Sequence, residues 1–195
     1  NRCRRQRQMC IRDRCTSSTV ITDNGSYFRD LVADCIDGAC PDNVQIGCWN
    51  TSEVTDMSSA FAGKAYNLQS SFNDSINCWD TASVTNMADM FLFAPNFNQP
   101  LDDWNVASVN TMSFMFGFAY NFNQPLDDWN VASVTTMNSM FLSATNFNQL
   151  LEDWNVASVT DMNAMFLASS NFNQLLENWN VCLLYTSDAA DDSDC

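Results

Sequence analysis

The sequence predicts an α/β fold in which stacked repeats form a solenoid, with a parallel β-sheet on one side and short helices on the other. Three observations predict it: a 25-residue repeat, a strand-like half followed by a helix-like half in each copy, and an amphipathic segment ahead of the first copy. That segment predicts a helical cap at the N-terminal end.

The repeat is marked by Trp residues at a constant spacing of 25: Trp79, Trp104, Trp129, Trp154 and Trp179. With Trp as position 1, the copies follow W-N-V-A-S-V-T-x-M-x-x-M-F-x-x-A-x-x-F-N-Q-x-L-x-D. The first copy covers residues 49–78 and has 30 residues, and the second to fifth copies begin at residues 79, 104, 129 and 154. A fixed period of this length indicates a stack of similar units.

Each copy contains two halves with different apolar periods. In "LDDWNV", residues 126–131, Trp and Val alternate with polar residues as in a strand with one buried face. In the second half, Met137, Met140, Phe141 and Ala144 fall at i, i+3, i+4 and i+7, which predicts one stripe of a helix. Position 7 carries a residue able to cap that helix in every copy: Thr55, Thr85, Asn110, Thr135 and Thr160.

A single copy cannot bury its Trp, Val, Met and Phe side chains, so we expect neighbouring copies to share a continuous core. The Met columns fit best as filler between layers, and a metal or heme role is the alternative. At position 20 we expect a ladder of amides that satisfies backbone groups at a turn, from Asn73, Asn98, Asn123, Asn148 and Asn173.

Residues 20–48 precede the repeats and contain an amphipathic segment. Phe28, Leu31, Val32 and Cys35 form an apolar stripe, and Gly38 follows as a stop signal. Asp23 or Asn24 is expected to cap the helix. We therefore expect these residues to cover the first layer of the solenoid, which spans residues 49–181.

The two ends differ from the rest of the chain. "RRQRQMCIRDR" at residues 4–14 and "LLYTSDAADD" at residues 183–192 resemble translated sequencing-adaptor sequence. We expect residues 1–19 to have that origin or to be disordered, and residues 182–195 to be an adaptor-derived tail. We expect the native chain to continue with further repeats. No secretory signal and no apolar run long enough to span a membrane is present in the sequence.

The charge of the repeats excludes some classes of partner. The chain has a net charge of −15, and residues 49–180 contain thirteen Asp or Glu against the single Lys64. Such a surface repels phosphate backbones and anionic lipids, so we expect no nucleic-acid partner.

The phrase "FNQxLxxWNVASVTxMxxMFxxA" strongly resembles the BspA-like leucine-rich repeat, also described as DUF285, of bacterial and protist surface proteins. The resemblance covers residues 49–181 and implies a leucine-rich-repeat-like solenoid with surface, adhesive or binding roles. It implies no catalytic residues.

Four cysteines lie outside the two ends: Cys35, Cys40, Cys48 and Cys78. Cys48 and Cys78 each precede a repeat Trp, and neighbouring strands about 4.8 Å apart would allow a disulfide between them. Cys35–Cys40 is the second expected disulfide. Both imply an oxidising compartment. A zinc site is the competing interpretation, but the ligand spacing is poor and the chain has no His.

The side chains on either side of each Trp are expected to point outward from the sheet and to form an acidic face. Its candidate binding residues are Asp80, Asp103, Asn105, Asp128, Asn130, Asp153 and Asn155. Stacked carboxylates repel one another, and calcium or a basic partner would relieve that repulsion. A solvated face without a ligand is the simplest alternative. No exposed aromatic side chain that would stack on a sugar is evident, because Trp and Phe are assigned to the core.

No enzyme is predicted, because the chain has no His, no Gly-rich phosphate loop and no nucleophile elbow. We expect a secreted or cell-surface module that binds a protein or glycan through the acidic face, with no cofactor other than possible calcium. The alternative is a passive stalk or spacer.

Overall fold

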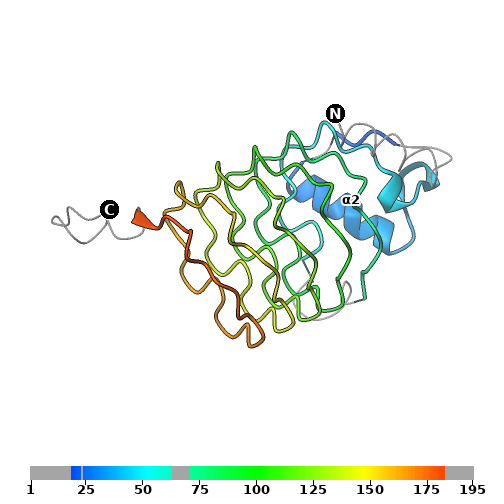
Figure 1. The fold of residues 1–195 in the computed structure, drawn as a ribbon. Helices are drawn as coiled ribbons and strands as arrows, with labels where there is room; N and C mark the ends of the chain where they lie inside the picture. Colours follow the sequence, from blue (N-terminus) through cyan, green and yellow to red (C-terminus); the bar gives the residue numbers. More distant parts are fainter. Residues whose placement is uncertain (1–18, 23, 63–70, 183–195) are drawn as a thin grey trace.

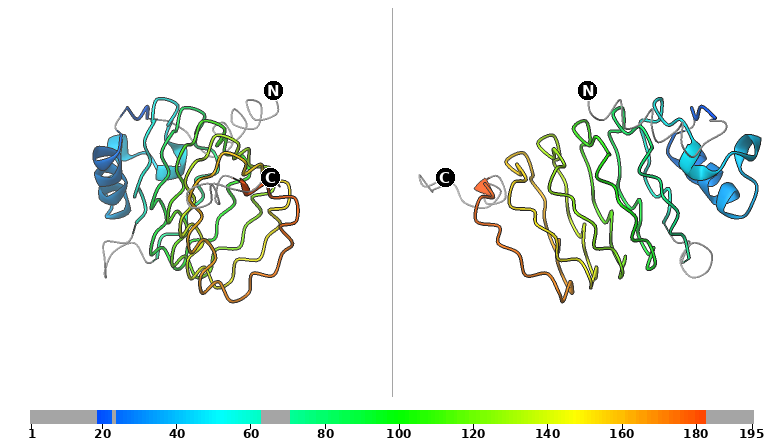
Figure 2. Two further views of the ribbon diagram at one scale, coloured as in Figure 1. Left: turned by 90° about the vertical axis from the view of Figure 1, so that its left-hand side faces the viewer. Right: turned by 45° about the vertical axis from the view of Figure 1, so that its right-hand side comes forward.

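The computed structural model describes residues 19–22, 24–62 and 71–182. In chain order they form helix α2 (Ser26–Ile36), the short 3-10 helices η1 (Pro41–Asn43) and η2 (Ile46–Cys48), and then successive coils that lie side by side (Figures 1 and 2). The terminal segments assigned to adaptor sequence lie outside the described residues, except Thr19 and Cys182. No helix in the described part is long and apolar enough to cross a membrane.

The predicted parallel β-sheet with short helices on its other side is wrong for the described residues, which contain one α-helix and no β-strand. Isolated parallel bridges join successive coils instead, at position 8 of each copy: Asp56, Asn86, Thr111, Thr136 and Asp161. Beyond each bridge, alternate N–H groups donate to the next coil, as from Phe91 N to Met115 O at 2.8 Å and from Phe93 N to Gly117 O at 2.9 Å. These bonds hold neighbouring coils in register.

The predicted helix in the second half of each copy is absent because the backbone becomes left-handed at every fourth residue. Positive φ occurs at positions 11 and 15, at Ser59, Asp89, Phe93, Phe114, Phe118, Ser139, Ser143, Ala164 and Ala168. An α-helix requires a continuous run of φ near −63°. The chain makes consecutive turns instead, such as Leu92 N to Asp89 O at 3.0 Å and Ala94 N to Phe91 O at 3.0 Å.

These turns bury the same side chains that a helix would have buried. Met137, Met140, Phe141 and Ala144 are each 0% exposed. The sequence therefore predicted the buried positions correctly and their backbone conformation wrongly.

The Thr residues at position 7 bond to the preceding coil and do not cap helices. The Thr135 hydroxyl donates to Asn110 O at 3.1 Å, and the Thr160 hydroxyl donates to Thr135 O at 3.1 Å. The backbone N–H groups of both residues donate to the same carbonyls. The capping prediction is wrong because no helix follows these residues.

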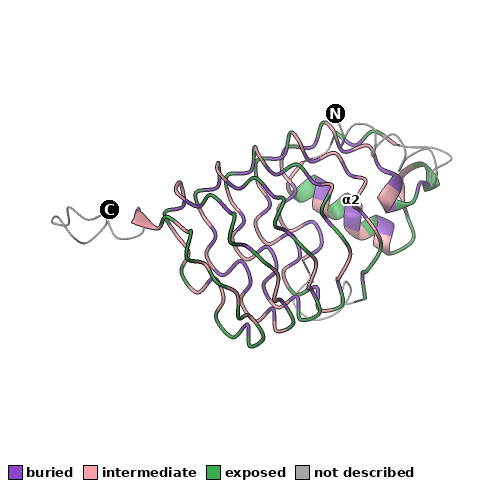
Figure 3. Ribbon diagram, viewed as in Figure 1, coloured by how far each residue is buried: buried purple, intermediate pink, exposed green. Residues whose placement is uncertain are grey.

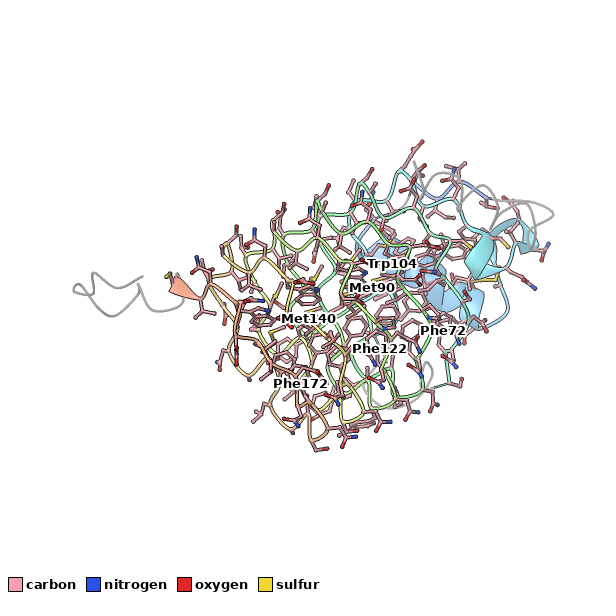
Figure 4. The ribbon with its side chains drawn as sticks, in the orientation of Figure 1. Phe72, Met90, Trp104, Phe122, Met140 and Phe172 are labelled. Atoms are coloured by element: carbon pink, nitrogen blue, oxygen red, sulfur yellow. A yellow bond between two sulfur atoms is a disulfide. The ribbon has the colours of Figure 1, made fainter. Side chains whose placement is uncertain are left out.

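The core consists of columns of stacked rings that run through successive coils (Figure 4). Trp79 and Trp104 lie 6.4 Å apart between ring centroids with planes at 2°, and Phe91 and Phe116 lie 5.5 Å apart at 3°. A third column runs beside them, with Phe97 4.1 Å from Phe91. The distance between successive ring centroids is longer in the Trp column than in the Phe91 column. The coils are therefore farther apart at the Trp column.

Polar ladders accompany the ring columns. The indole N–H of Trp129 donates to Leu101 O at 3.1 Å, which satisfies a buried donor. The position 20 ladder is confirmed, since Asn98 Oδ1 accepts from Asn123 N at 2.9 Å and from Gln124 Nε2 at 3.0 Å. Each copy thereby satisfies backbone and amide groups of the next.

Helix α2 lies against the first coils through its buried residues Phe28, Val32 and Cys35 (Figure 1). The ring of Phe28 contacts Trp79 edge-on at 5.6 Å. The helix ends where expected, and Gly38, with φ at 94°, donates its N–H to Cys35 O. The division into a cap at residues 20–48 and repeats at residues 49–181 stays a prediction.

The start of α2 differs from the prediction. Gly25 is the N-cap residue and no side chain caps the helix. The side chain of Asn24 accepts hydrogen bonds from the Thr55 hydroxyl and Asp56 N, each at 3.1 Å, and so joins this segment to the first coil. Asp23, the other candidate cap, lies outside the described residues.

Candidate binding surface

Carboxylates at positions 24 and 25 of successive copies form the acidic ridge, which we define as Asp102, Asp103, Asp127, Asp128, Glu152 and Asp153. All are exposed except Asp103, which is half-buried, and the Trp that follows each pair is buried. Figure 3 shows that buried and exposed segments alternate along each coil. The ring centroids of Trp104 and Trp129 are 6.4 Å apart, so the residues that carry the carboxylates repeat from coil to coil. Carboxylates that repeat in this way repel one another, as the sequence predicts.

Amide side chains hold the two ends of the acidic ridge. Asn77 Nδ2 donates to Asp102 Oδ1 and to Asp103 Oδ2, both at 3.1 Å, and Asn178 Nδ2 donates to Glu152 Oε1 at 3.0 Å. Within the described residues, the other side chains of the ridge, Asp127, Asp128 and Asp153, have no hydrogen-bond or ion-pair partner. These three carboxylates are therefore the part of the ridge most able to accept a cationic partner.

The residues predicted at position 2, directly after Trp, have a local role in the coil. Asn105 Oδ1 accepts a hydrogen bond from Ala107 N at 3.1 Å, and the same turn recurs at Asp80, Asn130 and Asn155. Asn and Asp commonly close such turns, so this role explains the residue type at position 2. A binding role for these four residues stays a prediction.

Calcium is the alternative ligand for the acidic residues. In the part of the chain that the structure describes, no three carboxylate, Cys or His groups lie close enough together to hold a metal ion. Calcium usually takes six to eight oxygen ligands. The calcium alternative therefore has no preformed group of protein ligands among these residues.

Asp89 lies apart from the acidic ridge, at position 11 of the second copy. Burial raises the pKa of its carboxyl above the ordinary value of 3.8. Ionisation of this carboxyl is therefore less favourable in the folded chain than in the unfolded chain. As the pH rises from the pKa of Asp89 in the unfolded chain through its higher pKa in the folded chain, this residue lowers the free energy of unfolding. The shift reflects desolvation alone and does not indicate an acid–base pair.

The cysteines gather beside η2 and the end of α2. The predicted Cys35–Cys40 disulfide is confirmed. Cys48 and Cys78 are each disulfide-bonded, and their pairing with one another stays a prediction. All four line one cavity of about 540 Å³, together with Ile46, Phe72 and several polar residues.

Peptide mapping without reduction tests the pairing. We expect one linked peptide that contains Cys48 and Cys78 and a second that contains Cys35 and Cys40. In a Cys48→Ser/Cys78→Ser variant the first should disappear and the second remain. Recovery of Cys48 bonded to any other cysteine would disprove the predicted pair.

Several aromatic side chains of the described residues lie outside the core, contrary to the sequence expectation: Tyr27 is 74% exposed, and three others gather on neighbouring coils. Phe93 is 45% exposed, Tyr120 is 43% exposed and Phe118 is half-buried. They occupy positions 15 and 17, where the repeat has no preferred residue, and their equivalents in the fourth copy are Ser143 and Thr145. Departure from the repeat pattern was the signal that could have identified them.

Comparison with known proteins gives one match. The sequence profile of the family described as "Mycoplasma protein of unknown function, DUF285" matches residues 33–149 and again residues 119–186. No curated protein and no solved structure matches the chain. The family match confirms the resemblance carried by the repeat phrase.

Proposed function

The chain belongs to the family described as Mycoplasma protein of unknown function, DUF285, and from this premise we propose that it is a non-catalytic, secreted or cell-surface binding module. Its partner is a protein or a glycan that contacts the acidic ridge. The family description assigns no function, so the proposal depends on the surface of this chain.

The observation that carries the proposal is the row of exposed carboxylates that have no partner among the described residues, Asp127, Asp128 and Asp153. Ring columns and amide ladders hold these coils in register, so a partner meets an ordered row of negative charge. Complementary charge speeds association and selects against wrong partners. A protein with a basic surface is therefore the partner that the ridge favours.

Two further features support a non-catalytic module outside the cytoplasm. The chain has no His, and the acidic pairs recur in three successive copies, from Asp102 to Asp153, which differs from a single catalytic site. The Cys35–Cys40 disulfide is typical of proteins in oxidising compartments.

A passive stalk is the second candidate, and the continuous ring columns favour it. Phe91, Phe116, Phe141 and Phe166 form one unbroken stack at steps of 5.5 Å. Such a stack resists bending because each layer touches the next. A stalk would need this stiffness and no ligand.

Charge reversal separates the two candidates. For an Asp103→Lys/Asp128→Lys/Asp153→Lys variant we expect beads coated with the chain to attach to cultured cells at least about tenfold less, because attraction becomes repulsion. The matched control reverses three other exposed carboxylates, Asp34, Asp37 and Glu53, and should attach like the unmodified chain.

Circular dichroism and thermal melting should show that both variants keep the fold. Equal attachment by the ridge variant, the control and the unmodified chain would favour the stalk. Attachment lost equally in both variants would indicate a non-specific charge effect and would also contradict binding at the ridge.

A further inference from the structure

Phe93, Phe118 and Tyr120 form an exposed aromatic cluster on neighbouring coils. The rings of Phe93 and Phe118 are stacked, with centroids 4.5 Å apart and planes at 13°. Tyr120 lies edge-on to Phe118 at 6.3 Å and 90°. Both outer members expose more than two fifths of their surface, since Phe93 is 45% and Tyr120 is 43% exposed.

The fold does not require aromatic residues at these positions. Phe93 and Phe118 both have φ at 57°, and the same left-handed conformation occurs at Ser143 and Ala168 in later copies. A residue with a side chain adopts this conformation at a cost of about 1–2 kcal/mol. Small residues satisfy the turn equally well, so the backbone conformation does not explain the two Phe residues.

The stack of exposed rings ends at Phe118. Phe93 covers one face of this ring, and the next two residues along the same column are Ser143 and Ala168, which carry short side chains. Among the described residues, the ring contacts of Phe118 are those with Phe93 and Tyr120. The aromatic column therefore stops at Phe118, and the residue that follows it on the next coil, Ser143, has no ring to stack on it.

The surroundings of Phe118 are polar and uncharged. Positions 12–23 contain no Asp, Glu, Lys or Arg in the second to fifth copies, at residues 90–101, 115–126, 140–151 and 165–176. Exposed amides border the cluster, and Asn146 Nδ2 donates to Asn121 Oδ1 at 3.4 Å. The Thr145 hydroxyl donates to Tyr120 O, also at 3.4 Å. Hydrogen bonds this long are weak, so these groups are able to exchange them for bonds to a ligand.

We propose that this cluster binds an uncharged glycan, with one sugar ring stacked on Phe118 above Ser143 and its hydroxyls bonded to Asn121, Asn146 and Thr145. An aromatic face accepts the C–H face of a sugar, and a side-chain amide offers both a donor and an acceptor to neighbouring hydroxyls. The absence of charge in these segments favours a neutral glycan over an anionic one. This site is separate from the acidic ridge, so the two proposals fail independently.

Affinity electrophoresis of the full chain tests the proposal. The probes are soluble uncharged polysaccharides, namely mixed-linkage β-glucan, xylan, galactomannan and hydroxyethyl cellulose, with heparin as the anionic comparison. We expect at least one neutral probe to retard the chain and heparin not to. Phe118→Ser, which introduces the residue found at Ser143, should weaken binding of that probe about tenfold, measured by calorimetry with an oligosaccharide of the same linkage.

Two controls make the result specific. Leu150→Ala removes an apolar side chain that is 58% exposed at position 22 and should leave binding unchanged. The ridge variant Asp103→Lys/Asp128→Lys/Asp153→Lys should also keep glycan binding, even if it loses its protein partner. Phe118→Ser should keep the fold and melt at a temperature close to that of the unmodified chain, because Ser occupies the same turn in the fourth copy.

The possible outcomes decide the proposal. Loss of binding in Phe118→Ser together with normal binding in both controls supports it. No retardation by any of the neutral probes overturns it, as does equal retardation of Phe118→Ser and the unmodified chain. Retardation by heparin alone would show an anion site and would also overturn it.

Discussion

Replacement of Phe116 by Ala is expected to lower the free energy of unfolding by about 3–5 kcal/mol, because it opens a large cavity in a packed core. Phe116 is 0% exposed, and its ring stacks on Phe91 and Phe141, each at 5.5 Å, and on Phe122 at 4.0 Å. The cavity lies in the middle of two ring columns, where no neighbouring side chain can move in without breaking the register of its own coil.

Urea unfolding followed by circular dichroism measures the effect. Phe93→Ala is the matched control, because it removes the same side chain from an exposed position two residues further along in the preceding copy. We expect the control to change stability by less than about 1 kcal/mol. Similar values for the two variants would show that the ring columns are not the source of stability.

Replacement of Asn123 by Ala is expected to lower the free energy of unfolding by about 2 kcal/mol, because it leaves half-buried donors without an acceptor. Asn123 Oδ1 accepts from Asn148 N at 2.9 Å and from Gln149 Nε2 at 2.8 Å. Asn123→Asp keeps an oxygen acceptor in the same place and should recover part of the loss.

The control for this change is Asn121→Ala, two residues earlier in the same copy. Asn121 is exposed, and its side chain makes hydrogen bonds of 3.5 Å and 3.4 Å to its neighbours in the ladder. Its replacement should change stability by no more than about 0.5 kcal/mol. Equal losses for Asn121→Ala and Asn123→Ala, measured by the same urea titration, would contradict a structural role specific to position 20.

The candidate sites differ in how far the sequence predicted them. The carboxylates beside each Trp were predicted as an outward column, since their place follows from a buried ring next to them. The turn-closing role of Asn105 was not predicted, because it depends on the path of the backbone after Trp. The cluster around Phe118 was missed because an aromatic residue is usually assigned to the core, and only the folded chain shows which rings lie outside it.

The sequence by itself determined the 25-residue period, the buried positions and the amide ladder, because repeated side chains must meet their equivalents when copies stack. Only the tertiary structure decided the backbone conformation. Apolar residues at i, i+3, i+4 and i+7 fit an α-helix, and they fit equally a series of turns with a left-handed residue at every fourth position. Positions 11 and 15 carry residues such as Asp89, Phe118 and Ala168. None of these residue types predicts a positive φ from the sequence, as Gly would. Hydrogen bonds to the next coil favour the turns, and such bonds exist only once the copies are stacked.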